Sequence, residues 1–163
     1  MAHVSVRWGM FLAGIIVVVG SAMASEVPPR KKGKLLRWLA SGAYRTTYLP
    51  EPDVHPSTPA HGINVRTWLS PRLVEDLRAG RPTYRRGAAM VKELYFAGDT
   101  DVVGWSVMRK LRRRSGATGR GWYFYETFDG TNDGAIAGRG KRICVSCHAA
   151  GDDFLLSPFR PAP

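Results

Sequence analysis

The residues best suited to chemistry lie close together near the C-terminal end of the 163-residue chain. Cys144 and Cys147 are the two cysteines of the sequence, and His148 directly follows the second. Two thiols at this spacing beside an imidazole suit three kinds of site: a thioredoxin-like redox pair, part of a zinc site, or the attachment site of a c-type haem. The compartment and the other available ligands discriminate between these three.

The N-terminus indicates an exported protein. Arg7 gives a short positive region, residues 10–20 are apolar, and residues 22–24 have the small-x-small pattern of a cleavage site. The apolar stretch is well short of the roughly 20 residues that span a bilayer. We therefore expect residues 1–24 to be a signal peptide and the mature protein to be periplasmic or otherwise exported.

The position of the cysteines favours haem over the other two sites. A thioredoxin-like pair is expected early in its fold, after a first strand. Structural zinc needs four ligands, and only His55 and His61 remain in the mature chain to complete a set. The C-x-x-C-H pattern is typical of haem c, so we predict thioethers from Cys144 and Cys147 and iron ligation by His148.

The mature chain is small and strongly basic. Residues 1–24 hold one of the 24 basic side chains and none of the 13 acidic ones, which leaves a net charge of +10. An exported chain rarely meets nucleic acid, so we expect no such partner and favour an acidic redox partner protein. The densest basic run, Arg109 to Arg114, is most simply interpreted as a solvated strand end and turn. After a polar tail at 25–33, residues 34–163 suit a single domain.

The spacing of apolar and turn residues predicts an α+β fold, a mostly antiparallel β-sheet with a few short helices. A short amphipathic helix is expected within residues 34–45, and a proline-rich loop follows up to His61. The pattern predicts a strand at 63–69 and a helix after Ser70 and Pro71 that ends at Gly80. Strand-like alternation then recurs at 88–96, 102–111 and 121–128.

Two charged residues interrupt apolar faces of these strands. Lys92 alternates with Met90 and Leu94, and Glu126 shares its face with Phe124. A charged group on an apolar face costs free energy unless it is paired or has a function. The structural alternatives are a Lys92 amine that reaches solvent at the sheet edge and a Glu126 paired with an arginine.

From His61 to Phe159 the order of the motifs resembles the cytochrome P-460 family. The resemblance is carried by the segments HGINVRTWLS, YRRGAAMVKELYF, VMRK, GWYFYETF and CVSCHAAGDDFLLSPF. It implies a homodimer with haem in a mostly antiparallel β domain, Cys144, Cys147 and His148 at the haem, and Lys92 linked covalently to the porphyrin. Members oxidise hydroxylamine, alone or with nitric oxide, whereas the related cytochromes c′-beta lack the crosslink and bind nitric oxide or carbon monoxide.

Three functions follow as alternatives. The first is a hydroxylamine-oxidising enzyme with an open distal iron site. The resemblance implies a distal carboxylate that relays protons, for which Glu126 is the best candidate by its strand face, with Asp129 and Asp133 behind it in the following loop. The second is a gas-binding haem protein without turnover. The third is a six-coordinate electron carrier, which needs a second axial ligand from Met90, Met108 or His61. The small partner is accordingly a nitrogenous substrate or a diatomic gas.

Overall fold

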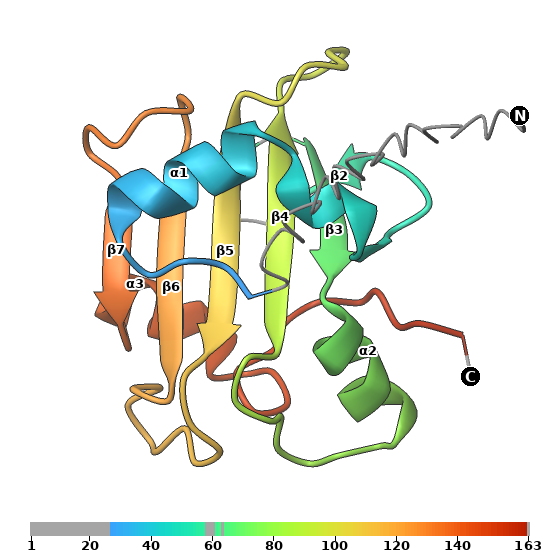
Figure 1. Ribbon diagram of the computed structural model, residues 1–163, viewed down its shortest axis with the longest axis vertical. Coiled ribbons are helices and arrows are strands. Elements are labelled where there is room, and N and C mark those ends of the chain that lie inside the picture. Colours follow the sequence, from blue (N-terminus) through green and yellow to red (C-terminus); the bar gives the residue numbers. More distant parts are fainter. Residues whose placement is uncertain (1–26, 58–60, 63, 163) are drawn as a thin grey trace, which may run out of the picture.

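The computed structural model describes residues 27–57, 61–62 and 64–162, so the expected signal peptide lies outside the described residues. These residues form one antiparallel sheet in the order β1-β3-β4-β5-β6-β7, with β2 paired to β3 beside β1 (Figure 1). Its strands are β1 (Leu49–Pro50), β2 (His55–Pro56), β3 (Asn64–Leu69), β4 (Ala89–Tyr95), β5 (Gly104–Lys110), β6 (Trp122–Thr127) and β7 (Ile136–Arg139). The sheet and its few short helices confirm the α+β class.

Short helices cover both faces of the sheet. They are α1 (Lys32–Ala40) with the 3₁₀ helix η1 (Ala43–Thr46), α2 (Pro71–Arg78) and α3 (Arg142–His148). In Figure 1, α1 crosses in front of the sheet and α3 lies behind it. None of the helices in the described ranges is long and apolar enough to cross a membrane.

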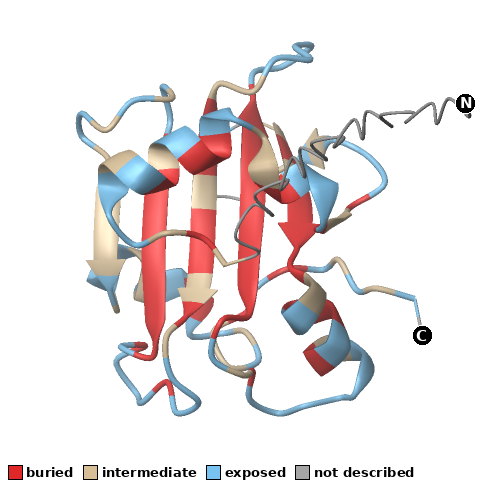
Figure 2. Cartoon of the chain, in the orientation of Figure 1, coloured by how far each residue is buried: buried red, intermediate tan, exposed pale blue. Residues whose placement is uncertain are grey.

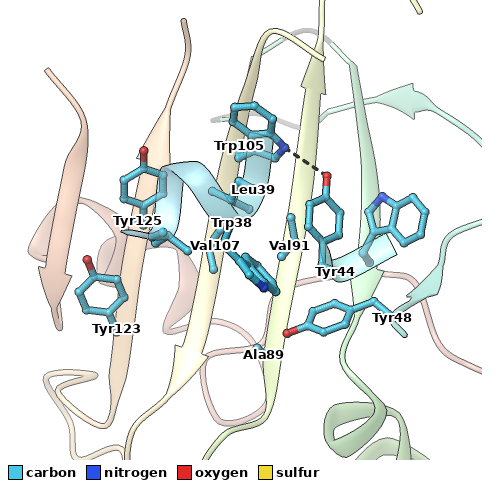
Figure 3. Packing of buried hydrophobic residues seen from close by; sticks show 12 residues of the cluster. Trp38, Leu39, Tyr44, Tyr48, Ala89, Val91, Trp105, Val107, Tyr123 and Tyr125 are labelled. Carbon is cyan, nitrogen blue, oxygen red and sulfur yellow. Dashed lines mark hydrogen bonds between the residues drawn. The ribbon is translucent and has the colours of Figure 1, made fainter. Parts of the chain in front are cut away.

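The α1 side of the sheet buries a cluster rich in aromatic residues (Figure 3). It includes Trp38, Leu39, Tyr44, Tyr48, Ala89, Val91, Trp105, Val107, Tyr123 and Tyr125. One charge is buried here, that of Glu93, whose side chain is 1% exposed. Its carboxylate accepts hydrogen bonds from the Tyr44 hydroxyl, from the Tyr95 hydroxyl at 2.6 Å and from Arg45 Nε at 2.7 Å. These bonds attach η1 to the middle of β4.

The α3 side of the sheet buries a second cluster, which α2 and the C-terminal segment cover. Its buried members are Leu69, Leu73, Val74, Tyr84, Ala88, Met90, Met108, Trp122, Phe124 and Leu155. Ser70 caps α2 as expected, since its Oγ accepts from the Leu73 N–H at 3.3 Å. Figure 2 shows β4 and β6 buried along their whole length, which places both faces of the central strands in the core.

Three local expectations differ from the structure. The first helix starts at Lys32 rather than inside 34–45, and the preceding tail packs: Pro28 is buried and its carbonyl accepts from Arg109. The glycine-rich segment after β6, for which no strand was expected, contains β7, whose Gly138 has φ 147°. The interpretation of Arg109 to Arg114 as solvated was wrong for Lys110, which is fully buried.

Candidate functional site

Helix α3 carries the C-x-x-C-H motif on the face of the sheet opposite α1. Residues three and four apart lie on one side of a helix, so Cys144, Cys147 and His148 are neighbours. Both cysteines are free thiols, with Cys144 half-buried and Cys147 exposed. Burial raises the pKa of the Cys144 thiol to about 11, so this thiol is protonated at neutral pH. The two thiols and the imidazole are thus presented together, as attachment to a single group requires.

His148 is held in one orientation by the chain that follows it. Its side chain is buried, and Nδ1 lies 2.9 Å from the Phe154 carbonyl oxygen. A carbonyl only accepts, so Nδ1 carries the proton and Nε2 keeps its lone pair. Burial lowers the pKa of His148 to about 4, which keeps the ring neutral at pH 7. A neutral imidazole with Nδ1 fixed by a backbone carbonyl is the usual state of a metal-ligating histidine.

A buried network fixes the Phe154 carbonyl in turn. Asp153 and Phe154 have φ values of 46° and 71°, a region that residues other than glycine seldom adopt. The Asp153 carboxylate accepts from Lys110 Nζ and from the Tyr84 N–H at 2.8 Å, and its carbonyl accepts from Trp122 Nε1 at 2.7 Å. Strand β5 therefore supports the turn that orients His148.

Lys92 and Glu126 lie in one row across the central strands. Lys92 pairs with Ser106 of β5, and Ser106 pairs with Glu126 of β6, so the three side chains share the α3 side of the sheet. The alternation in each strand had shown which neighbours Lys92 and Glu126 share a strand face with. It had not shown that both residues lie on the same side of the sheet. The register also adds Ser106, which sequence reasoning missed because its small side chain gave no signal.

The Lys92 amine is buried, and the described residues give it no partner. Its side chain is 9% exposed, and within the described part of the chain no hydrogen bond or ion pair to Nζ is found. Burial lowers its pKa, opposed by the charges of Glu51 and Glu126. Lys92 lines a cavity of about 620 Å³ together with His61, Cys147 and His148. The structure thus places an uncompensated amine in the same cavity as the motif histidine.

Glu126 is joined to the site through His61. His61 Nδ1 lies 2.5 Å from Glu126 Oε1, and the His61 ring centroid lies 5.9 Å from that of His148. His61 and His148 also line a second cavity of about 150 Å³, which Glu126 and Cys144 border. The sequence had suggested His61 as a possible zinc ligand or sixth haem ligand, and no sequence signal connected it to Glu126. The alternative in which Glu126 pairs with an arginine is wrong, because its partner is this histidine.

Other candidates lie away from the site. Asp129 is exposed and its carboxylate accepts from Thr127 and Thr131 within its own loop, and Asp133 is exposed as well. Neither aspartate lines the cavities described above. Met90 and Met108 are packed in the core. Of the three residues considered as a second axial ligand, only His61 lies at the site.

The arrangement fits a haem better than a bare metal ion. In the residues that the structure describes, no group of three or more His, Cys, Asp or Glu side chains gathers to hold an ion. The features present are two free thiols, one imidazole with a free Nε2, and a largely apolar strand face beside a cavity within the usual 300–1,000 Å³ of cofactor sites. These are the groups that a covalently attached macrocycle with one axial ligand requires.

Comparisons with family models, curated proteins and solved structures found no match for this chain. The function of the chain is therefore inferred from the residues of the site.

Proposed function

We propose that the protein is an exported mono-haem c-type cytochrome of the P-460 kind, which oxidises hydroxylamine alone or with nitric oxide. Cys144 and Cys147 would hold haem c through thioethers and His148 would ligate its iron through Nε2. Both thiols are free, and the Phe154 carbonyl already fixes the histidine with Nε2 available.

The observation that carries the proposal is the buried amine of Lys92, which has no hydrogen-bond or ion-pair partner among the described residues. A buried lysine normally finds a carboxylate or loses its proton, and the neutral amine is a nucleophile. We propose that Lys92 Nζ bonds to a porphyrin carbon. That step forms one N–C bond and breaks one N–H and one C–H bond, and the two electrons and two protons released reduce hydrogen peroxide to water. The crosslink would explain why the amine has no partner in the part of the chain that the structure describes.

His61 and Glu126 suit the handling of protons at the same cavity. When bound, haem supplies the redox-active iron that takes electrons from the nitrogenous substrate. Each electron removed from hydroxylamine is accompanied by a proton, so the site needs an acceptor. The Glu126 carboxylate accepts the Nδ1 hydrogen of His61, which leaves His61 Nε2 as a base. Glu126 then stabilises the ring when that base takes a proton.

The test is a count of covalent links to the haem. In the wild type, we expect haem peptides from a digest to contain Lys92 bonded to the porphyrin in addition to the two thioethers. Lys92→Ala should retain two thioethers, show an ordinary c-type absorption spectrum and lose hydroxylamine oxidation. Ser106→Ala, a change in the same strand row, is the matched control and should keep all three links. A wild type with two links and an ordinary spectrum would refute the enzyme and favour a gas-binding protein like the cytochromes c′-beta.

One observation favours a second function, that of a six-coordinate electron carrier. His61 has its Nδ1 engaged and its ring against His148, so its Nε2 is a candidate sixth ligand. Resonance Raman spectra of the ferric protein decide between the two. We expect five-coordinate signals. Six-coordinate low-spin signals that disappear in His61→Ala would establish the carrier instead.

The resemblance also implies a homodimer, and the N-terminus implies a periplasmic or otherwise exported location. Light scattering of the purified holoprotein would measure its oligomeric state. Cell fractionation would test the exported location, and N-terminal sequencing of the mature protein should start at residue 25.

A further inference from the structure

Seven basic side chains stand exposed at one end of the sheet, and we call them the basic surface. They are Arg112, Arg113, Arg114, Arg120, Arg139, Lys141 and Arg142. They come from two separate segments, the loop from β5 to β6 and the connection from β7 to α3. Figure 1 shows that this loop and the end of β7 lie at the same end of the sheet.

Direct contacts hold the two segments together. Arg139 Nε donates to the Arg120 carbonyl at 3.4 Å, and the Gly140 N–H donates to the Trp122 carbonyl at 3.0 Å. Gly119 of the loop packs against α3 so closely that a Cβ there would lie 2.7 Å from Val145 Cγ2. The basic surface therefore adjoins the helix that carries the C-x-x-C-H motif.

The charges of this surface have no ion-pair partners among the described residues. Residues 109–125 and 134–151 contain no Asp or Glu, and none of the seven side chains forms an ion pair with the acidic residues that the structure describes. Arg112, Arg113 and Arg114 are consecutive like charges. Lys141 is the N-cap of α3 and Arg142 is its first residue. The partial positive charge at the N-terminus of the helix repels both cations. An unneutralised cluster of this kind creates a positive field that attracts an anionic partner.

An exposed apolar residue lies within the basic surface. Ile143 follows Arg142 and is 66% exposed, the largest value among the exposed large apolar side chains of the described chain. It also borders the smaller cavity together with Cys144 and Cys147. An apolar centre inside a charged rim is the usual anatomy of a protein interface. A partner that packs on Ile143 would therefore meet the chain beside the thioether cysteines.

We infer that the basic surface docks an acidic one-electron redox protein, which accepts the electrons removed from the substrate. The inference rests on the proposed function for the presence of haem. In each transfer the haem iron loses one electron and the oxidised metal centre of the partner gains it. A membrane is a weaker match for this surface, because a single exposed isoleucine gives little apolar area to insert.

The experiment measures electron transfer to plastocyanin, an acidic blue-copper protein, as the probe. Reduced holoprotein is mixed with oxidised plastocyanin in a stopped-flow instrument at several ionic strengths. We expect a second-order rate that falls as salt rises, and a loss of about tenfold or more at low salt in the Arg112→Glu/Arg113→Glu/Arg114→Glu variant. The loss should shrink at high salt, because the Debye length is about 3 Å at 1 M.

A matched control separates local docking from net charge. Arg72→Glu/Arg78→Glu/Arg86→Glu changes three exposed residues in α2 and just before β4 by the same total charge. We expect it to lower the rate by less than about threefold, since α2 lies toward the edge of the sheet opposite β7 (Figure 1). Equal losses in the two variants would overturn the inference. The inference would also be overturned if the Arg112→Glu/Arg113→Glu/Arg114→Glu variant lost its binding to phosphatidylserine vesicles but kept the wild-type rate of electron transfer. That result would show that the basic surface binds a membrane.

A binding readout keeps this inference distinct from the proposed function. NMR titration of the ¹⁵N-labelled protein with plastocyanin at low salt should shift amides in the two segments and in α3, whether or not hydroxylamine is oxidised. If no haem is attached, the proposed function fails while the amide shifts still report the docking surface. If haem is attached and the shifts fall elsewhere or are absent, the docking inference alone fails.

Discussion

The buried pair of Lys110 and Asp153 gives the sharpest test of how the turn after α3 is held. The Lys110 side chain is fully buried and that of Asp153 is 3% exposed. Lys110 Nζ also lies 2.5 Å from Ser115 Oγ and 4.8 Å from the centroid of the Trp122 ring. Lys110→Met fills nearly the same volume but removes the cation. Asp153 then keeps only its neutral hydrogen bonds while its charge remains buried.

The expected cost of Lys110→Met is about 3–5 kcal/mol in the free energy of unfolding, the range for removing one partner of a buried ion pair. That is a third or more of the roughly 5–15 kcal/mol that stabilises a typical domain. The assay is urea denaturation of the purified protein, followed by tryptophan fluorescence and circular dichroism. Because Asp153 supports the Phe154 carbonyl, the proposed haem site gives a second readout, a changed iron–histidine stretching frequency.

Two controls make this prediction refutable. Lys110→Met/Asp153→Asn removes both charges, and asparagine tolerates the positive φ of that position, so the double variant should recover much of the lost stability. Arg112→Met removes an exposed cation two residues away and should change stability by about 0.5 kcal/mol or less. A Lys110→Met cost of under about 1 kcal/mol would refute the role given to the pair.

Three further predictions concern the histidine, the cap and the carboxylate. In the haem-free Cys144→Ala/Cys147→Ala variant, stability should fall by about 3 kcal/mol as the pH drops from 6.5 to about 4, because the unfolded chain protonates His148 before the folded chain does; a flat pH profile in urea titrations would contradict this. Ser70→Ala should cost about 2 kcal/mol, because the Leu73 and Ala89 N–H groups both lose the Ser70 Oγ acceptor; a loss under about 0.5 kcal/mol on urea denaturation would show that the cap contributes little. Glu126→Gln should slow hydroxylamine oxidation on the order of 10²-fold while the haem spectrum stays unchanged; an unchanged rate would exclude Glu126 from proton transfer.

The strand faces were predictable from the sequence, because alternation in a strand is a local property. The patterns at 88–96, 102–111 and 121–128 placed Lys92 and Glu126 on their faces correctly, and the caps of α2 were equally local. The order of the strands and their register were not predictable in this way, since cross-strand pairing depends on residues far apart in the chain. Only the register shows that Lys92 and Glu126 flank Ser106 in one row.

The misinterpretation of Lys110 has a physical cause. In the sequence it stands in a run of basic residues, so its neighbours suggested solvent. Its partner, Asp153, is 43 positions away and reaches it only because the turn after α3 folds under β5. His61 was undervalued for the same reason, since its partner Glu126 is 65 positions away. Local patterns report on the environment of a strand face but not on a long-range charge pair.

Two adjacent residues of β4 contrast a charge with a structural role and a charge for which we propose a functional one. Lys92 and Glu93 are both buried at the centre of the same strand, on opposite faces. The Glu93 carboxylate is satisfied by two hydroxyls and a guanidinium, so its burial is explained by the packing of η1 on the sheet. Lys92 faces the cavity beside His148 and has no such donor or acceptor in the described structure. Since an unpaired buried amine destabilises the fold, its place beside the cavity supports the bond to a porphyrin carbon proposed above.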